Sequence, residues 1–353
     1  MIMKKYINST IVLLLIISLS SCFTEETPVT PHEAGSATVN SVTMGKKYDT
    51  RVYFDLGTNQ VVSSHSIDDW DMGFSCEPGN FSVILNDSKL MTAGDLGQVS
   101  IDTPIDPEDT TLTIEWKFDE PTGHKDSTSI GFWYESENGI SAVSKEHIYL
   151  VDKGINSKSR PQGYVKLMIQ SASANDYLIT FADPDGSNKH ELVVETNEDK
   201  NYIYISFADA GSVVDLEPPK TDWDLLFTKY WDYFYLNDGT FQPYSVSGAL
   251  INPYYVKAIR STLTKPLSAD STVALPFEEI TFADVDESAL LPVKNIIGYT
   301  WKWFNFAESY YEILSFKTYL ISDTDGFLYK LRFTDFYDED GYKGSPKFEF
   351  ERL

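Results

Sequence analysis

The sequence predicts an all-β fold, arranged as two tandem antiparallel β units with few short helices. Apolar and polar residues alternate strictly at 111–118, 329–334 and 347–351, and this period of two places the apolar side chains on one face of a sheet. Dipeptides typical of hairpin turns separate such runs: Asp87-Ser88, Asn138-Gly139, Asp185-Gly186, Asp325-Gly326 and Asp340-Gly341. The best helical segment, 286–291, is a single turn that ends at Pro292.

A hexapeptide of rare residues occurs twice, as DWDMGF at 69–74 and as DWDLLF at 222–227. Other segments recur in the same order: 51–56 with 202–207, 84–87 with 235–238, 130–132 with 297–299, and 147–151 with 317–321. A doubled series in one order indicates a doubled structural unit. We therefore predict one unit at 44–200 and a second at 201–353, with Trp70 and Trp223 buried in equivalent strands.

The first residues predict an exported, lipid-anchored protein. Two lysines precede the apolar run 11–17, which is too short to span a bilayer but typical of a signal peptide, here 1–21. The sequence at 19–22, LSSC, is typical of a bacterial lipobox, in which the chain is cleaved before Cys22 and the Cys22 thiol is acylated. The alternative is an ordinary secretory peptide with an incidental cysteine. Residues 22–43 are rich in Pro, Thr, Glu and Ser, which predicts a flexible tether.

The number of cysteines and the residues after the lipobox give further information about disulfide bonds and location. If Cys22 is acylated, Cys76 is the remaining thiol of the 2 cysteines, so the mature chain forms no intrachain disulfide. We expect Cys76 to be a buried structural thiol. The acidic pair Glu25-Glu26 resembles an export signal of Bacteroidetes lipoproteins, although a solvated linker is the plainer interpretation. The predicted location is the bacterial outer membrane, by a lipid anchor, with the folded part at the cell surface.

Composition and motifs exclude several classes of function. The net charge of −25 disfavours nucleic acid as a partner, because phosphate binding requires clustered Lys and Arg. The chain has no nucleophile elbow, no His-Glu-x-x-His, no phosphate loop and no dinucleotide fingerprint, so we predict that it is not an enzyme. The acidic turns at Asp183 and Asp338 lack the spaced ligands of a calcium loop. We therefore predict no catalytic residues and no metal site.

Several of these features together resemble the HmuY family of surface lipoproteins from Bacteroidetes. They are the lipobox, the strand around 53–54, the Trp-Asp-x-x-Phe motif and, most specifically, the closing segment 319–336. The second unit is similar from end to end, and the first unit is similar more loosely. The resemblance implies an all-β fold, haem binding, and delivery of haem to an outer-membrane transporter.

The resemblance also implies two histidine ligands for haem, shortly before and within the strand-turn region that precedes the strand at 319–321. In the second unit this region is 301–308, WKWFNFAE, and it contains no histidine. No histidine follows His190, and no methionine follows Met168. A haem site with two strong axial ligands is therefore not expected in the second unit.

In the first unit, His124 and His147 lie on either side of 130–134, broadly the stretch that carries the ligands in the family. Both are therefore candidate cofactor-binding residues, with haem as the cofactor. The alternatives are that His124 belongs to an exposed loop and that His147 is an ordinary residue at a strand edge. Three methionines of this unit are further candidates for soft ligands: Met72, Met91 and Met168.

The function predicted from these observations is that of a surface-anchored, non-catalytic lipoprotein of the HmuY type that binds and acquires haem. Its expected partners are the outer membrane, haem and an outer-membrane transporter. The alternative is a cell-surface interaction or glycan-binding lipoprotein that has lost the haem ligands of the family. The aromatic clusters at 230–235 and 301–306 could stack on haem or a sugar, or they could belong to the core of a sheet.

Overall fold

The computed structural model describes residues 35–353, except 237 and 269–270. This part of the chain is all-β, which confirms the predicted fold class. Its helical elements are 3-10 turns of three residues each: η1 (Ile67–Asp69), η2 (Asp87–Lys89), η3 (Ala208–Ala210), η4 (Phe277–Glu279), η5 (Phe282–Asp284) and η6 (Glu287–Ala289). The predicted turn at 286–291 corresponds to η6. None of the described helices has the length and apolar character needed to cross a bilayer.

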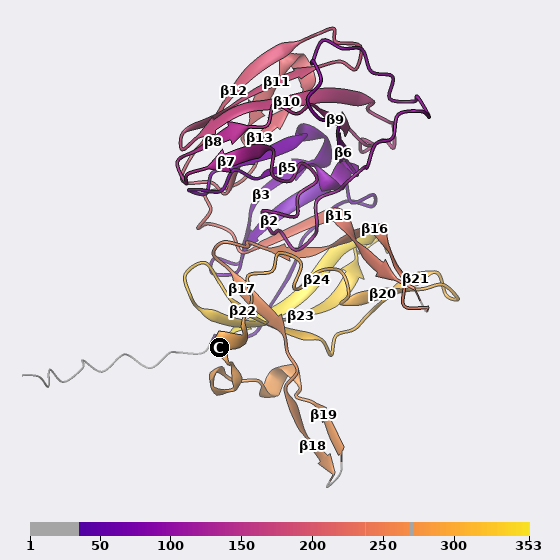
Figure 1. Cartoon of the computed structure of the whole chain (residues 1–353). Coiled ribbons are helices and arrows are strands. Elements are labelled where there is room, and N and C mark those ends of the chain that lie inside the picture. Colours follow the sequence, from indigo (N-terminus) through magenta and orange to yellow (C-terminus); the bar gives the residue numbers. More distant parts are fainter. Residues whose placement is uncertain (1–34, 237, 269–270) are drawn as a thin grey trace, which may run out of the picture. The chain divides into compact units, whose positions relative to one another are not determined.

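One large sheet has the strand order β1-β24-β23-β22-β17, and all of its neighbouring strands are antiparallel. Its strands are β1 (Thr38–Ser41), β24 (Lys343–Arg352), β23 (Leu328–Tyr337), β22 (Thr318–Ser322) and β17 (Lys257–Arg260) (Figure 1). The alternating runs 329–334 and 347–351 lie within β23 and β24, so these two strand predictions are confirmed.

The second large sheet has a matching path, β12-β11-β10-β9-β6, and β10 also pairs with the hairpin β8–β7. Its strands are β6 (Thr92–Asp95), β7 (Tyr134–Glu137), β8 (Ser141–Ser144), β9 (Tyr149–Asp152), β10 (Tyr164–Ser173), β11 (Asp176–Ala182) and β12 (His190–Glu195). The turns Asn138-Gly139 and Asp185-Gly186 join β7 to β8 and β11 to β12, as predicted.

The strand predicted at 111–118 is wrong. This segment contacts β6 through a single bridge, in which Ala93 and Lys117 exchange two backbone hydrogen bonds of 2.9 Å. The other edge of β6 pairs with β9 over four residues. The alternating pattern was present, but a strand also requires a partner along its length, and here the backbone partner extends over one residue only.

Four shorter sheets complete the described part. One has the order β16-β15-β2-β3 and another the order β14-β13-β4-β5. Their strands are β2 (Thr50–Asp55), β3 (Gln60–Ser66), β4 (Met72–Ser75), β5 (Val83–Leu85), β13 (Tyr202–Ser206), β14 (Ser212–Val214), β15 (Leu225–Tyr235) and β16 (Phe241–Ile251). Two separate hairpins are formed by β18 (Thr264–Ser268) with β19 (Ser271–Ala274), and by β20 (Lys302–Asn305) with β21 (Tyr310–Ile313).

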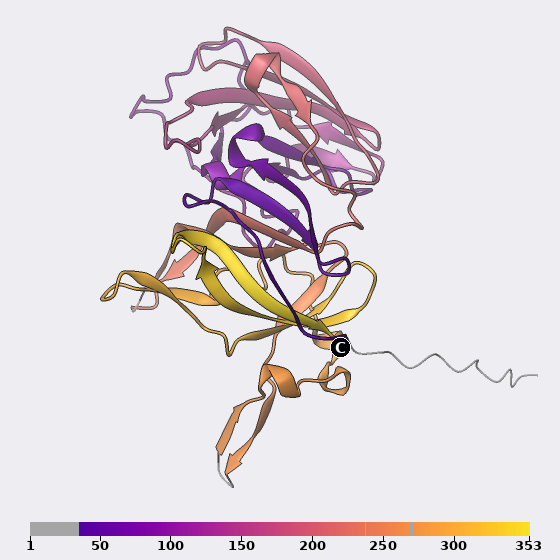
Figure 2. The same ribbon diagram turned by 180° about the vertical axis from the view of Figure 1, so that it is seen from behind.

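Strands that are distant in sequence pair with each other. The N-terminal β1 pairs with the C-terminal β24, and β2 pairs with β15. The back view in Figure 2 shows the indigo N-terminal chain beside the yellow C-terminal strands. Conversely, β13 pairs with β4. The predicted tether at 22–43 therefore includes a strand, because β1 lies within it and Val42 is buried.

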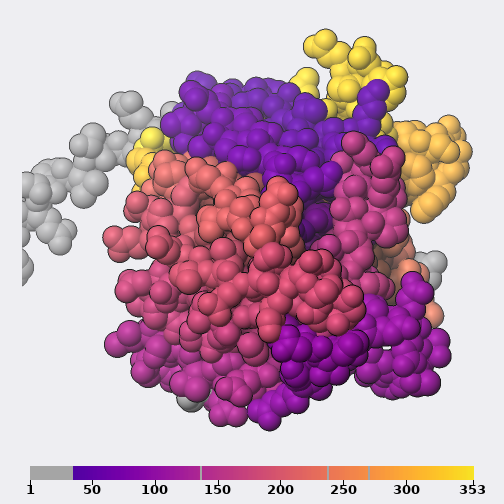
Figure 3. All heavy atoms as spheres, turned by 90° about the horizontal axis from the view of Figure 1, so that it is seen from above, coloured from indigo at the N-terminus to yellow at the C-terminus, as the bar shows by residue number. Residues whose placement is uncertain are grey.

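Two main core clusters follow from this pairing. One joins Val52 and Phe54 of β2 to residues of β15, β23 and β24. The other joins Ile205 of β13 to Met72 and Phe74 of β4 and to residues of β9, β10 and β11. Each core thus takes side chains from both sides of the predicted unit boundary at residues 200 and 201. Figure 3 shows indigo N-terminal residues beside residues from the middle of the chain.

The two Trp-Asp motifs occupy matching environments. Trp70 and Trp223 are 2% and 4% exposed, which confirms the predicted burial. Their predicted placement within strands is wrong, because each lies two residues before a strand. Trp70 packs edge-to-face on Tyr204 at 4.8 Å, and Trp223 packs edge-to-face on Tyr53 at 5.0 Å. Each tryptophan therefore contacts the strand that pairs with its own motif.

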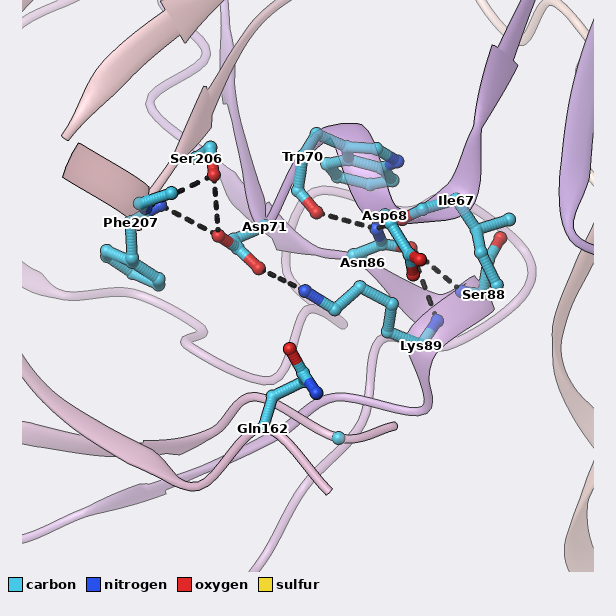
Figure 4. Close-up of polar contacts among 12 residues, drawn as sticks. Ile67, Asp68, Trp70, Asp71, Asn86, Ser88, Lys89, Gln162, Ser206 and Phe207 are labelled. Atoms are coloured by element: carbon cyan, nitrogen blue, oxygen red, sulfur yellow. Dashed lines mark hydrogen bonds and ion pairs between the residues drawn. The ribbon is translucent and has the colours of Figure 1, made fainter. Parts of the chain in front are cut away.

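The aspartates that follow these tryptophans receive backbone hydrogen bonds from the residues directly after the same partner strands. Asp71 accepts from the Phe207 N–H at 2.7 Å and also pairs with the buried Lys89 ammonium at 2.5 Å (Figure 4). Asp224 accepts from the Leu56 N–H at 2.8 Å. Burial raises the pKa of Asp224 to about 7, since desolvation disfavours the charged carboxylate, and the nearby Asp323 and Asp55 add to this shift.

The expected correspondence between 84–87 and 235–238 is wrong. The amide of Asn86 donates to the Trp70 carbonyl, and the amide of Asn252 donates in the same way to the Trp223 carbonyl. The register agrees, because Leu85 faces Met72 and Ile251 faces Leu225. The counterpart of Asn86 is thus Asn252. The hairpin β15–β16 is much longer than β4–β5, which moved the equivalent residue along the chain.

Candidate ligand-binding site

His124 lies in an exposed loop that packs against β15. The ring of Phe118, at the start of this loop region, lies 5.4 Å from that of Trp231 and 5.7 Å from that of Tyr233. The Tyr233 hydroxyl donates to the Glu120 carboxylate. The His124 side chain itself is exposed. The loop is therefore held by aromatic contacts while its histidine faces solvent.

His147 immediately precedes the buried Ile148 and the strand β9, and its side chain is 28% exposed. Its Nδ1 lies 2.9 Å from the carboxylate of Asp95 on β6. A carboxylate bound to one ring nitrogen orients the imidazole and leaves the other nitrogen for a metal ligand, as in many metalloproteins. In this arrangement Nε2 of His147 is the nitrogen available to a ligand.

A groove of about 540 Å³ lies in the region of these two histidines. Neither histidine lines it. Asp95, the partner of His147, forms part of its wall, and so does the loop 126–131, which begins two residues after His124. Three aromatic side chains contribute the apolar surface: Trp116, Phe118 and Tyr149. The volume falls in the range of small-molecule sites in proteins.

The electrostatics of the groove are acidic. Its lining includes the carboxylates of Asp95, Glu115, Glu120 and Asp126 and the ammonium of Lys117. The excess of carboxylates opposes burial of an anionic group, so the acidic substituents of a ligand would have to face solvent.

A smaller cavity of about 50 Å³ is lined by His124 and by residues of both Trp-Asp motifs. Arg51 is 5% exposed there, and its guanidinium carbon lies within 5.3 Å of the ring centres of Tyr53, Trp70 and Tyr204. Burial raises the pKa of Glu217 to about 7. The volume suffices for a few water molecules, not for a porphyrin.

The remaining candidate ligands belong to the interior of the protein. Met72 and Met91 are buried in a main core, and Met168 packs against a smaller apolar cluster. Cys76 is buried and free, as predicted, and burial raises the pKa of its thiol to about 11. Within the described residues, no three His, Cys, Asp or Glu side chains are grouped so as to hold a metal ion.

The two aromatic clusters that the sequence singled out are each divided between core and surface. Tyr230 and Trp301 are fully buried. In contrast, Phe234 and Tyr235 at the end of β15, and Trp303 and Phe306 in the hairpin β20–β21, are exposed by 42%, 69%, 46% and 82%. The division follows position along the chain, because the two buried rings belong to core clusters, while the exposed rings lie at the end of β15 or in the hairpin β20–β21.

Comparison with known proteins gives the following similarities. Residues 198–350 match the family model described as HmuY protein. A search of curated proteins found no relative. Apo PinO from Porphyromonas gingivitis is similar over 90% of this chain and 98% of its own, with 10% identity and a TM-score of 0.29. The apo HmuY analog TFO from Tannerella forsythia is similar over 91% and 99%, with 12% identity and a TM-score of 0.27.

Proposed function

We propose that this chain, whose residues 198–350 match the HmuY family, is a non-catalytic surface lipoprotein that binds haem and consists of two HmuY-like units. The observation that carries the proposal is the aromatic groove of about 540 Å³ beside Asp95 and His147. The family match supports haem as the ligand. The paired contacts of Trp70 and Trp223 support the two units.

In this proposal Trp116 and Phe118 would pack against the porphyrin, and His147 and His124 would be the residues that hold the iron. The iron supplies the coordination chemistry when haem is bound. Asp95 holds Nδ1 of His147, which would leave Nε2 to bind the iron. His124 is exposed and must turn toward the groove. The acidic lining would disfavour burial of the haem propionates.

The location follows from the sequence alone, because Cys22 lies outside the described residues. We propose that the acylated Cys22 anchors the chain in the outer membrane, with the folded part at the cell surface. A binding protein in this place would pass haem to an outer-membrane transporter. Nucleic acid is not a partner in this proposal, given the net charge of −25.

A haem titration of the full mature chain tests the proposal. We expect a sharp, redox-sensitive Soret band of six-coordinate haem, and a loss of affinity of about tenfold or more in His124→Ala and in His147→Ala. His190→Ala is the control, because this residue lies at the start of β12 against Phe181. The full chain is required, since a fragment starting at Tyr202 would lack β1 and β2.

Unchanged haem affinity in both His124→Ala and His147→Ala would remove these residues from the site. Absence of haem binding by the full chain would contradict the proposed function itself.

A further inference from the structure

The hairpin β20–β21 presents two faces of different character. Its register places Trp303 opposite Glu312 and Asn305 opposite Tyr310. Directly opposite residues of an antiparallel pair share one face, so these four side chains lie together. Phe304 and Tyr311 form the pair on the other face. The hairpin is labelled in Figure 1.

The face with Phe304 and Tyr311 packs inward. The rings of these residues are 5.1 Å apart, and Tyr311 lies 5.1 Å from the buried Phe336. The neighbouring Lys302 is also buried and donates to the Ser247 carbonyl at 2.5 Å. These contacts hold the hairpin in place, and none of them involves the side chains of the opposite face.

The opposite face exposes two aromatic rings around a bonded polar pair. Trp303 and Tyr310 are 46% and 43% exposed and occupy diagonal positions. Between them, the Asn305 amide donates to Glu312 Oε1 at 2.5 Å, and the Tyr310 hydroxyl lies 3.4 Å from the same oxygen. Neither bond uses Oε2 of Glu312. The polar groups are thus held in place, with acceptor capacity left over.

We propose that this face, defined by Trp303, Asn305, Tyr310 and Glu312, binds a pyranose ring of a neutral oligosaccharide. A pyranose has C–H surfaces that stack on aromatic rings and hydroxyl groups around its rim. Trp303 and Tyr310 supply the stacking surfaces. Glu312 accepts hydroxyl hydrogen bonds through Oε2, and Asn305 contributes its amide.

Charge and composition select this class of ligand over others. The carboxylate of Glu312 and the net charge of −25 oppose acidic polysaccharides and phosphorylated ligands. A purely apolar ligand would desolvate the Asn305–Glu312 pair without replacing its hydrogen bonds to water, which is unfavourable. The site shares no residue with the groove near His147, so it does not depend on haem binding.

Isothermal titration of the full mature chain with cellohexaose, maltohexaose and chitohexaose tests the site. We expect at least one of these probes to bind, and Trp303→Ala and Tyr310→Ala to weaken that binding by about tenfold or more. Glu312→Gln should also weaken it, because the amide of Gln replaces a strong acceptor. Phe316→Ala is the control, since Phe316 is 67% exposed but lies outside this face.

The proposal would be overturned if no probe bound at millimolar concentration, or if Trp303→Ala and Tyr310→Ala bound as tightly as the wild type. Thermal unfolding of each variant shows whether it is folded. If an aromatic variant does not fold, Glu312→Gln, a nearly isosteric change, still tests the site. Haem titration of Trp303→Ala should match that of the wild type. A failure of this site is therefore distinguishable from a failure of the haem proposal.

Discussion

Individual buried ionisable residues are held by specific partners instead of bulk solvent. Lys166 is fully buried in β10 and donates to the carbonyls of Ile101 and Thr103 at 2.5 and 2.7 Å. Lys330, at 2% exposure in β23, donates to the Ile280 carbonyl at 2.9 Å. Each lysine attaches a loop to a central strand. Lys330 also forms an ion pair with Glu351 at 3.2 Å. Because a buried ammonium without partners is unfavourable, these contacts stabilise the attachment of each loop to its strand.

Glu217 makes the stability depend on pH. Burial raises its pKa from 4.5 to about 7, so between these values the folded chain holds a proton that the unfolded chain has released. This contribution to stability is complete below the unfolded pKa and is lost as pH rises through the folded pKa. Glu217→Gln does not titrate, so its stability does not fall in this way. The difference in free energy of unfolding between the variant and the wild type should therefore change by about 3 kcal/mol from acidic to alkaline pH.

Urea unfolding of both proteins at pH 5 and pH 8 measures this effect. Glu115→Gln is the control, because its side chain is 83% exposed and its charge should not alter the pH dependence. Parallel pH dependences of Glu217→Gln and wild type would show that the carboxyl of Glu217 is not responsible.

At the scale of elements, the pairing of strands across the sequence determines how the two motifs are built. β2 pairs with β15, and β13 pairs with β4. The aromatic contacts of Trp70 with Tyr204 and of Trp223 with Tyr53 lie at these two junctions. The tryptophans therefore fill a local core and also pack where strands from distant parts of the sequence pair.

Replacement of either tryptophan should destabilise the protein to a similar degree. Trp70→Ala and Trp223→Ala each leave a cavity in a buried aromatic cluster, and we expect a cost of about 3–5 kcal/mol each. Chemical denaturation measures the cost. Trp303→Ala is the matched control. Because Trp303 is 46% exposed, this variant should lose much less free energy of unfolding. Near-wild-type stability of either buried variant would contradict the structural role given to the motif.

At the scale of the whole molecule, the described residues from 35 to 353 form one compact unit by their contacts. The pairing of β1 with β24 joins the start of this unit to its end. The predicted anchor at Cys22 precedes it, so attachment to the membrane and folding of the β structure should be separable.

Cys22→Ala tests this separation. We expect the variant to remain as an uncleaved precursor or to be released from membranes, and to lose metabolic palmitate labelling, because the thiol that carries the lipid is absent. Its folded part should keep the circular dichroism of the wild type. Unchanged palmitate incorporation would disprove acylation at Cys22, and Cys76→Ser, which removes the other cysteine, should retain the label.

The sequence by itself determined the fold class, the β23 and β24 runs, several hairpin turns and the burial of Trp70 and Trp223. These properties are local, since alternation and turn residues act over a few positions. The pattern at 111–118 shows the limit, because its alternation was present while a partner strand was not. Of the candidate site, the sequence indicated only the neighbourhood of His124 and His147, and neither of these histidines lines the groove. The role of Asp95 was missed, because 52 residues separate it from His147.

Only the tertiary structure decided which distant strands pair, where the aromatic clusters divide between core and surface, and which side chains meet at the groove. Partner choice in a sheet depends on long-range contacts, whose free energy is not encoded in any short window. The same reason explains the counterpart of Asn86, which is Asn252 and not residue 237. Equivalence there is set by register across β4–β5 and β15–β16, while spacing along the chain changes with hairpin length.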